Sequence, residues 1–358
     1  MLNLLTLSGL LGWRTVAIAA AAIVLLWLVL AIASATKGRA RPLSMVIFVA
    51  VGMLFVLHKV ARGGAGMWWS FGPASTSISA VLTAVSFSFA ALRVVDATIA
   101  VVWRGERLVD PISLSGYILP FHMLPAGPIA AYHDHVAIDD VPLPPPTFSH
   151  LVASVDEITT GLFYKFVIAQ GLKYLAFGAA GTLAAPLTFL DTAYLLVYLF
   201  FDFAGYSRVA VGIGGLCGIP TPRNFHAPFA AVSITDFWTR WHASLSAFVR
   251  RNFYLPLQLR LVRRLGRERA PYAGLLSLVV AFGFVGVWHQ IGFGFLLWGV
   301  TMGIVMFVEK LVRDRWLQTD WIRTRPALIA LSIIGPVYVF VTIAGSLRYV
   351  MHSVLGLG

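Results

Sequence analysis

Two tryptophan–histidine pairs are the parts of this sequence whose residue types could do chemistry. His242 follows Trp241 in the stretch TRWHASLS, and His289 follows Trp288 in the stretch GVWHQIG. Both stretches lie among apolar residues, where a histidine is costly unless it faces a cavity or a partner. An imidazole can take up and release a proton near neutral pH. The two histidines are therefore candidates for a functional site that handles protons.

Each pair also has a purely structural explanation. Trp288 could belong to an aromatic belt at the membrane surface, with His289 wetted in a loop. The helix after Ser233 could be an amphipathic surface helix. Its start is marked by Ser233 and Asp236, which fit an S-x-x-D capping box. If that helix continues through 242, then His242, Ser246 and the backbone near Trp238 share one face at a spacing of four.

The composition restricts the class of protein. The chain has 358 residues, of which 59% are hydrophobic and 12% charged, with a mean hydropathy of +0.83. These values predict a polytopic membrane protein. The single cysteine, Cys217, excludes an intrachain disulfide framework and a Cys-rich metal site. The net charge of +12 comes from arginines between apolar segments, which the positive-inside rule explains without a nucleic-acid partner.

Apolar runs long enough to cross the hydrocarbon core as helices recur along the whole chain. We expect an all-α fold with about 8–11 membrane helices, forming a single integral membrane domain over 1–358. Interrupted stretches at 205–219 and 229–259 are expected to be re-entrant or interfacial. The predicted spans are 15–35, 43–60, 77–103, 112–131, 158–180, 186–204, 271–288, 290–308 and 327–346.

The loops between these spans predict a topology. Residues 132–157 carry five acids and a proline run, and are predicted to be an extended external loop. Residues 260–269 and 310–325 are basic and are expected in the cytoplasm. Spans 271–288 and 290–308 then form a hairpin, with His289 at the turn away from the cytoplasm. Embedded acids and lysines are expected to neutralise each other in pairs.

Four segments, in chain order, resemble the core of the membrane-bound O-acyltransferase (MBOAT) family, with weaker similarity earlier in the chain. The resemblance covers roughly 58–308 and is closest to the bacterial branch that contains the D-alanyl transfer protein DltB and the alginate O-acetylation protein AlgI, nearer to the former. The four segments are FFDFAGYSRVAVG, GIPTPRNFHAPF, SITDFWTRWHASLSAFVRRNFYLPL and GFVGVWHQIGFGFLLWG. The weaker ones are SFSFAALRVVD, LPFHMLPAGPI and ITTGLFYKFVIAQ.

The resemblance implies a site. His289 matches the catalytic histidine of the family and His242 the second histidine of the bacterial branch, at a central tunnel where donor and acceptor meet. The substrate-binding residues expected beside them are Trp238, Trp241, Ser246, Trp288 and Gln290. The basic segment 250–269 is expected to face the cytoplasm and to dock the donor or its carrier through Arg250, Arg251, Arg260, Arg263 and Arg264. No metal ion is implied.

The implied reaction is acyl transfer from a thioester to a hydroxyl, with His289 as general base. The favoured reaction is transfer of a D-alanyl group to an extracytoplasmic envelope polymer or carrier, and O-acetylation of an exopolysaccharide is the alternative. The donor would be a phosphopantetheine-carrier thioester or acyl-CoA, and no cofactor would be bound covalently. Expected partners are a cytoplasmic acyl carrier protein, a periplasmic or extracellular acyltransferase- or esterase-like protein, and membrane lipids, and the expected location is the bacterial inner membrane. A proton-coupled transporter or flippase is the alternative of another class.

Overall fold

The computed structural model describes residues 2–36, 41–61, 86–139, 146–177, 188–316 and 334–348. Within these ranges the chain is built from helices, and the only β-pairing described is one isolated bridge between Phe225 and Trp241. The all-α prediction is confirmed. Contacts divide the chain into two compact units, Met1–Val155 with Ala210–Pro222, and Asp156–Val209 with Arg223–Gly358.

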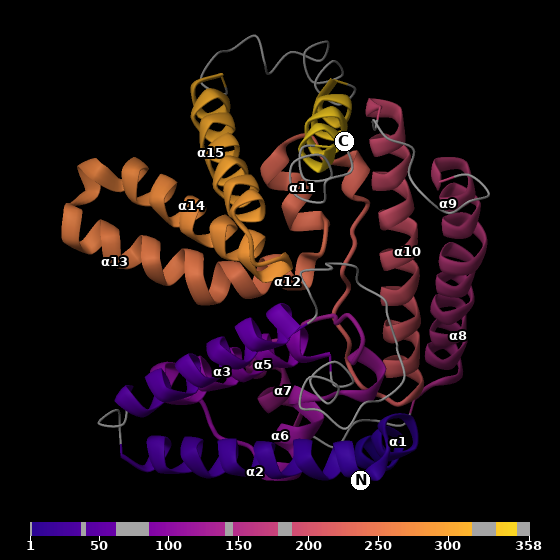
Figure 1. Ribbon diagram of the computed structural model, residues 1–358, viewed down its shortest axis with the longest axis vertical. Helices are drawn as coiled ribbons and strands as arrows, with labels where there is room; N and C mark the ends of the chain where they lie inside the picture. The colour runs from indigo at the N-terminus through magenta and orange to yellow at the C-terminus, as the bar shows by residue number, and fades with distance from the viewer. Residues whose placement is uncertain are drawn as a thin grey trace. The chain divides into compact units, whose positions relative to one another are not determined.

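The first unit contains the N-terminal helices, coloured indigo to purple in Figure 1. Their bounds are α1 (Leu2–Leu11), α2 (Trp13–Ala35), α3 (Arg41–Ala61), α5 (Phe87–Ile99), the π-helical turn η1 (Ala100–Arg104), α6 (Pro111–Ile118), the 3-10 turn η2 (Phe121–Met123) and α7 (Tyr132–Asp139). Their apolar faces share one core that includes Leu30, Val109 and Leu114. Asp110 begins α6 by accepting hydrogen bonds from the backbone amides of Ile112 and Ser113.

Two buried charges organise the segment between α6 and α7. Arg93, only 1% exposed, donates hydrogen bonds to the carbonyls of Ile118, Met123 and Pro128 at 3.2, 3.3 and 2.9 Å. Asp96, on the same helix, accepts from the amide of Tyr132 at 2.9 Å. A buried charge is tolerated when such bonds satisfy it. Because this irregular segment lacks regular helical hydrogen bonds, Arg93 supplies donors to three of its backbone carbonyls.

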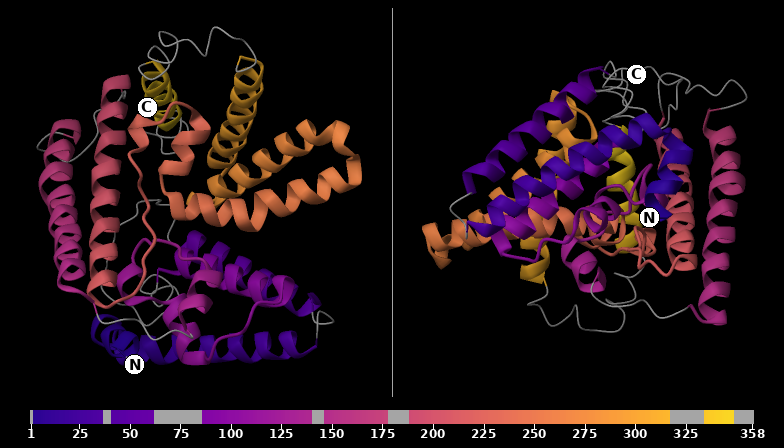
Figure 2. Two further views of the ribbon diagram at one scale, coloured as in Figure 1. Left: turned by 180° about the vertical axis from the view of Figure 1, so that it is seen from behind. Right: turned by 90° about the horizontal axis from the view of Figure 1, so that it is seen from below.

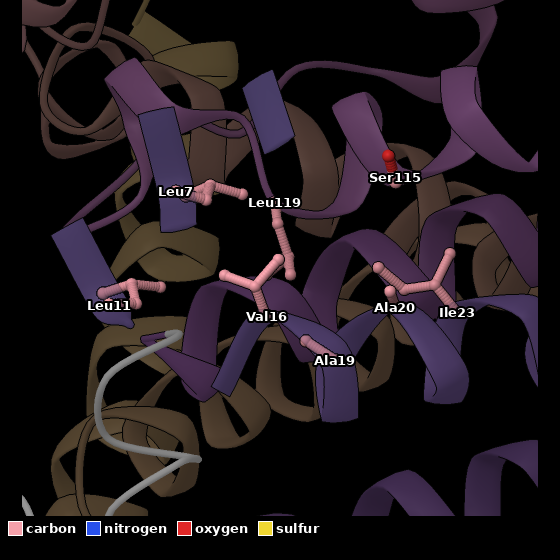
Figure 3. Close-up of a pocket in the computed structure, with 8 residues that line it drawn as sticks. All are labelled: Leu7, Leu11, Val16, Ala19, Ala20, Ile23, Ser115 and Leu119. Carbon is pink, nitrogen blue, oxygen red and sulfur yellow. The ribbon is translucent and has the colours of Figure 1, made fainter. Parts of the chain in front are cut away.

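A small apolar pocket lies between α1, α2 and α6 in the first unit, and Figure 3 shows its lining. The residues around it are Leu7, Leu11, Val16, Ala19, Ala20, Ile23, Ser115 and Leu119. The one hydroxyl among them, that of Ser115, donates to the carbonyl of Ile112 within its own helix. The pocket therefore offers no polar chemistry.

The second unit begins within a long helical run and ends with the C-terminal helices. Its elements are the later part of α8 (Phe148–Phe163), η3 (Tyr164–Ile168), α9 (Ala169–Phe177), most of α10 (Phe189–Leu216), η4 (Pro228–Ala230), α11 (Ile234–Arg240), α12 (Ala243–Val249), η5 (Arg250–Tyr254), α13 (Leu255–Leu265), η6 (Arg267–Arg269), α14 (Ala270–His289) and α15 (Phe293–Trp316), followed by the helix Ile334–Arg348. Helices α13 and α14 pack side by side, and α14 forms a hairpin with α15, as Figures 1 and 2 show.

Helices α8 and α10 approach closely within the second unit. A Cβ added to Gly205 would lie 2.7 Å from the carbonyl oxygen of Gly161, so only glycine fits there. One turn further along, the ammonium of Lys165 lies 2.6 Å from the carboxylate of Asp202. This pair confirms the expectation that embedded charges neutralise each other. Asp96, another embedded acid, pairs with Arg104 at 3.9 Å and also accepts from the amide of Tyr132, while Asp191 accepts from the amide of Thr188.

Five helices in the described ranges are long and apolar enough to cross a membrane: Trp13–Ala35, Arg41–Lys59, Phe189–Leu216, Arg267–His289 and Phe293–Asp314. They correspond to predicted spans 15–35, 43–60, 186–204, 271–288 and 290–308. Span 77–103 is described only from residue 86, and 327–346 only from 334, where a shorter apolar helix, Ile334–Arg348, begins. Span 158–180 is the later part of a helical run that begins at Phe148 and is described to Phe177.

Three predictions about irregular segments are wrong. Span 112–131 is not one helix, because α6 ends at Ile118 and a proline-rich turn follows. Stretch 205–219 is not separate, since α10 continues to Leu216. The predicted extended loop 132–157 is helical over Tyr132–Asp139 and again from Phe148. Polar composition alone does not exclude helix when hydrogen bonds hold the segment, as Asp139 shows by binding Arg107 of the same unit at 2.9 Å. Residues 140–145 lie outside the described ranges.

The described parts of the basic stretches 260–269 and 310–325 are also mostly helical. Helix α13 continues to Leu265, and α15 continues to Trp316, while 317–325 lie outside the described residues. Arginine is a good helix former, so a basic stretch next to an apolar run extends the helix instead of ending it. The cytoplasmic side assigned to both stretches remains a prediction.

Candidate functional site

The site begins with a helix that the sequence marks clearly. Ser233 caps α11 by accepting a hydrogen bond of 2.9 Å from the amide of Asp236, as the capping box predicts. From α15, the carboxylate of Glu309 accepts from the amides of Ile234 and Thr235 at 2.7 and 3.1 Å. The first turn of α11 is therefore anchored to the last third of α15.

The prediction that this helix continues through 242 is wrong. Helix α11 ends at Arg240, Trp241 is extended, and His242 adopts a left-handed conformation with φ of 46° before α12 begins. A non-local pairing breaks the helix, because Ala243 donates from its amide to the carbonyl of Asn224 at 2.9 Å. A left-handed residue other than glycine is strained, and such strain gathers at functional sites.

His242 is enclosed by aromatic and polar side chains. Its side chain is almost fully buried, and its ring centroid lies 4.8 Å from that of Phe203 on α10 and 6.5 Å from that of Trp288 on α14. Its Nδ1 atom lies 3.3 Å from Oδ1 of Asn224. Burial, and then repulsion from the nearby His289, lowers the pKa of His242 to about 3. At neutral pH its imidazole is therefore uncharged.

His289 is the last residue of α14 and lies at the turn into α15, as predicted. Its ring centroid is 4.9 Å from that of Trp288 and 6.3 Å from that of Trp298 on α15. The close packing of α14 against α15 fixes this position, because a Cβ added to Gly286 would collide with the carbonyl of Phe295. The structure thus brings His242 and His289 to the same indole, that of Trp288.

The other predicted substrate-binding residues divide into two groups. Trp238 contacts Trp298 with centroids 6.0 Å apart, and Ser246 donates to the carbonyl of Trp238 at 2.6 Å, so both lie near the histidines. Gln290 ends α14 with its amide donating to Gly286, beside His289. Trp241, in contrast, stacks on Phe237 of the hydrophobic core, with centroids 5.4 Å apart. Trp241 is therefore a packing residue of the wall behind the site.

The predicted docking arginines lie on consecutive elements. Arg250 and Arg251 belong to the π-helical turn η5, and the other three to α13. Arg260, Arg263 and Arg264 are exposed, as is Arg250, while Arg251 is half-buried. The four exposed arginines form a basic surface on η5 and α13.

Sequence reasoning missed three members of the site, Asn224, Phe203 and Trp298. Asn224 is 1% exposed and bonds to His242, Ser244 and Ser207. A signal for it existed, since it is a polar residue within GIPTPRNFHAPF, one of the segments that carries the family resemblance. Nothing local in the sequence indicates that Phe203 or Trp298 faces a histidine. In the parts of the chain that the structure describes, no group of three His, Cys, Asp or Glu residues could hold a metal ion.

These features, a helical membrane fold with a buried and a half-buried histidine against one indole, agree with what sequence comparison finds. The family model of the membrane-bound O-acyltransferases (MBOAT) matches residues 10–351, and the chain belongs to this family. The family and the five candidate spans make it a multi-pass membrane protein.

Named relatives come from several branches of bacterial envelope modification. The chain is 36% identical over 153 residues to the peptidoglycan O-acetyltransferase of Helicobacter pylori, covering 42% of this chain and 28% of the relative. It is 28% identical over 259 residues to the probable alginate O-acetylase AlgI of Azotobacter vinelandii, covering 68% and 48%. It is 27% identical over 213 residues to the teichoic acid D-alanyltransferase of Bacillus subtilis, covering 57% and 54%. The chain spans about half or less of the length of these relatives.

Proposed function

We propose that this protein transfers an acyl group from a thioester donor to a hydroxyl group of an envelope polymer or carrier outside the cytoplasm. The observation that carries the proposal is the shared contact of His242 and His289 with the indole of Trp288. Two imidazoles from separate segments of the chain that meet one indole form a reaction centre, because packing alone requires no titratable ring at either position. The family membership supports the same reaction class.

His289 serves as the general base. A hydroxyl group is a poor nucleophile at neutral pH, so its proton must leave as the oxygen attacks the thioester carbonyl. The imidazole of His289 takes that proton, the new C–O bond forms, and a tetrahedral oxyanion results. When the C–S bond breaks, the thiolate leaves and receives the proton back from the imidazolium. Base catalysis of this kind is worth about 10²- to 10⁴-fold in rate.

The aromatic cluster provides the walls of this centre. Trp238, Trp288 and Trp298 surround the histidines with apolar surface and exclude water, which would otherwise hydrolyse the thioester. The buried indole N–H of Trp238 has no acceptor among the described residues, and it is a donor that a substrate oxygen could use. This supports the inclusion of Trp238 among the substrate-binding residues.

Among the candidate acyl groups, we favour D-alanyl. Its ammonium would be favoured by the faces of the three tryptophans through cation–π attraction. The resemblance of the chain to the bacterial branch, nearer to its D-alanyl transfer protein, supports the same choice. Acetyl transfer is the second candidate, because relatives in Helicobacter pylori and Azotobacter vinelandii are named as O-acetylating proteins.

The donor is proposed to be a carrier-bound phosphopantetheine thioester or acyl-CoA that approaches from the cytoplasm. Both donors carry phosphate groups, and an acyl carrier protein is acidic, so the exposed arginines of η5 and α13 favour them electrostatically. This assignment places the protein in a bacterial inner membrane. A periplasmic or extracellular acyltransferase- or esterase-like partner would act on the exported product.

The test compares three strains that express the wild type, His289→Ala or His226→Ala at equal levels in the membrane. His226 is an exposed histidine of the same unit and serves as the matched control. Mass spectrometry of the isolated envelope polymer should show ester-linked D-alanine or acetate with the wild type and with His226→Ala, but not with His289→Ala. Full modification with His289→Ala would remove His289 from the mechanism, and no ester in the wild-type strain would refute acyl transfer to such a polymer.

A further inference from the structure

Asn224 is the centre of a buried hydrogen-bond network around His242. Its side-chain oxygen lies 2.5 Å from the hydroxyl of Ser244 and 3.3 Å from Nδ1 of His242. Its amide nitrogen lies 3.0 Å from the hydroxyl of Ser207 on α10. All four side chains are buried, so each polar group depends on these partners and not on bulk water.

The distances decide which way the amide of Asn224 faces. A contact of 2.5 Å fits an O–H···O hydrogen bond and is too short for an N–H···O bond, whose distances begin at about 2.7 Å. The atom that faces Ser244 is therefore the carbonyl oxygen, which accepts from the serine hydroxyl. The 3.0 Å contact with Ser207 fits the amide nitrogen as donor.

The orientation of the amide fixes the tautomer of His242. A carbonyl oxygen can only accept, so the Nδ1 atom that faces it must carry the proton. Because His242 is neutral at physiological pH, its Nε2 atom then bears a lone pair. A neutral imidazole in this tautomer can accept a hydrogen bond at Nε2 but cannot donate one.

We infer that Asn224 is a positioning residue that holds His242 as the Nδ1–H tautomer, so that Nε2 accepts a hydrogen bond from a hydroxyl of the acceptor other than the one whose proton passes to His289, instead of donating to the oxyanion. The assignment of the tautomer stands on the network alone. The role toward the hydroxyl rests on the proposed function. His242 could orient the acceptor or stabilise the oxyanion. The Nδ1–H tautomer is compatible with the first role, because its Nε2 atom can accept a hydrogen bond but cannot donate one.

The backbone reinforces the arrangement. The carbonyl of Asn224 accepts from the amide of Ala243, and His226 donates from its amide to the carbonyl of Arg240 at 3.0 Å. The segment that carries Asn224 is therefore paired with the residues on both sides of His242. Ser207 ties the same amide to α10, so the ring orientation is set by three segments at once.

The inference is tested by ¹⁵N NMR of the full-length protein in detergent, with selective ¹⁵N labelling of histidine. Protonated and unprotonated ring nitrogens have well separated chemical shifts. The signals of His242, one of nine histidines, are assigned by their loss in His242→Asn. We expect a protonated Nδ1 and an unprotonated Nε2 in the wild type, and loss of this preference in Asn224→Ala. A protonated Nε2 in the wild type would overturn the inference, as would an unchanged tautomer in Asn224→Ala.

Two further variants keep the test decisive if Asn224→Ala does not fold. Asn224→Asp retains an oxygen acceptor toward Nδ1 and should preserve the Nδ1–H tautomer. Ser207→Ala removes the partner of the amide nitrogen, so the amide is free to turn and a mixture of tautomers is expected. Asn252→Ala, a change at another buried asparagine of the same unit, is the control and should leave the signals of His242 in place.

A kinetic measurement then addresses the role in transfer. The carboxylate of Asn224→Asp favours the protonated imidazole and raises the pKa of His242. Protonation removes the lone pair at Nε2, so the acidic limb of the pH profile of kcat should move to higher pH, with the rate at alkaline pH largely kept. If the acidic limb of the kcat profile did not move, His242 would have no role in orienting the acceptor. If the tautomer is as expected but no acyl ester forms in the wild type, the proposed function fails and the tautomer assignment stands.

Discussion

The hydroxyl of Ser246 donates a hydrogen bond of 2.6 Å to the backbone carbonyl of Trp238, across the break between α11 and α12. The two residues are eight positions apart, so this contact exists only because the chain turns at His242. It holds the start of α12 against the aromatic cluster. The contact therefore couples the strained backbone of His242 to the position of Trp238.

Ser246→Ala tests this coupling. The change removes one hydrogen bond and leaves a half-buried carbonyl without its partner, which should cost about 1 kcal/mol in the free energy of unfolding. A larger effect is expected on transfer, roughly tenfold in kcat, because small displacements of positioned groups are costly for catalysis. Ser277→Ala is the control, since Ser277 bonds only within its own helix, to the carbonyl of Ala273. Equal rates in both variants would contradict a role for the contact.

Glu309 provides a second anchor. Its carboxylate accepts from the amides of Ile234 and Thr235 at the positive end of α11, where a negative charge is favourable. Glu309→Ala should lower the free energy of unfolding by about 2–3 kcal/mol, since hydrogen bonds to charged groups are worth roughly 1.5–3 kcal/mol. Glu309→Gln keeps an acceptor and should cost less. Thermal unfolding in detergent measures both.

Lys310→Ala is the matched control for Glu309. The ammonium of Lys310 pairs with Asp314 on an exposed face of α15, and exposed ion pairs contribute little. Its thermal midpoint should stay near that of the wild type. If Lys310→Ala were as destabilising as Glu309→Ala, the anchoring of α11 by Glu309 would not explain the effect.

The parts that sequence predicts correctly depend on local physical rules. A long apolar run followed by a polar turn is enough to place His289 between two membrane helices, and an S-x-x-D pattern is enough to start α11 at Ser233. Both are properties of neighbouring residues. The same holds for the all-α class, which follows from the length and number of apolar runs.

The parts that sequence misses depend on contacts between distant residues. The break at His242 comes from pairing with Asn224, 18 positions away, and periodicity within one helix cannot reveal it. Arg93 likewise holds the carbonyls after α6 in an irregular path, although the prolines of span 112–131 are a local sign that one helix does not cross it. The family resemblance identified the two histidines. The role of Asn224 follows only from its contacts with Ser207, His242 and Ser244, and that of Trp298 only from its contacts with Trp238 and His289.

Gly286 offers a test of how α15 positions His289. A Cβ at residue 286 would collide with the backbone carbonyl of Phe295, so Gly286→Ala must push α14 and α15 apart next to the catalytic candidate. We expect a loss of about 1–3 kcal/mol in stability from overpacking, and a roughly 10²-fold fall in kcat from displacement of His289. Gly171→Ala is the control, since a Cβ on that helical glycine meets nothing within 4 Å.

The result for Gly286→Ala separates packing from chemistry. If stability falls but kcat does not, the position of His289 tolerates the displacement and close helix packing has no catalytic role. In Gly171→Ala, both quantities should stay the same or stability should rise slightly, because alanine is the better helix former. Thermal unfolding and single-turnover kinetics on the same detergent preparations give both numbers.

The basic surface of α13 leads to a prediction about the donor. Arg263 and Arg264 are exposed and form no ion pair with another of the described residues, so reversing both charges should leave the fold intact. If they attract an acidic carrier or the phosphates of acyl-CoA, Arg263→Glu with Arg264→Glu should raise the KM for the donor roughly tenfold at low salt and leave the KM for the acceptor unchanged. The effect should shrink as ionic strength rises, because exposed charges are screened.

Arg348→Glu is the control for charge reversal, because Arg348 is an exposed arginine on a helix outside this surface. Its donor KM should match that of the wild type. The competing explanation is that Arg263 and Arg264 only direct membrane insertion. In that case the double variant would show a changed topology in cysteine-accessibility labelling, and the fraction that inserts correctly would use the donor with a normal KM. An unchanged donor KM at low salt, with normal topology, would contradict both explanations.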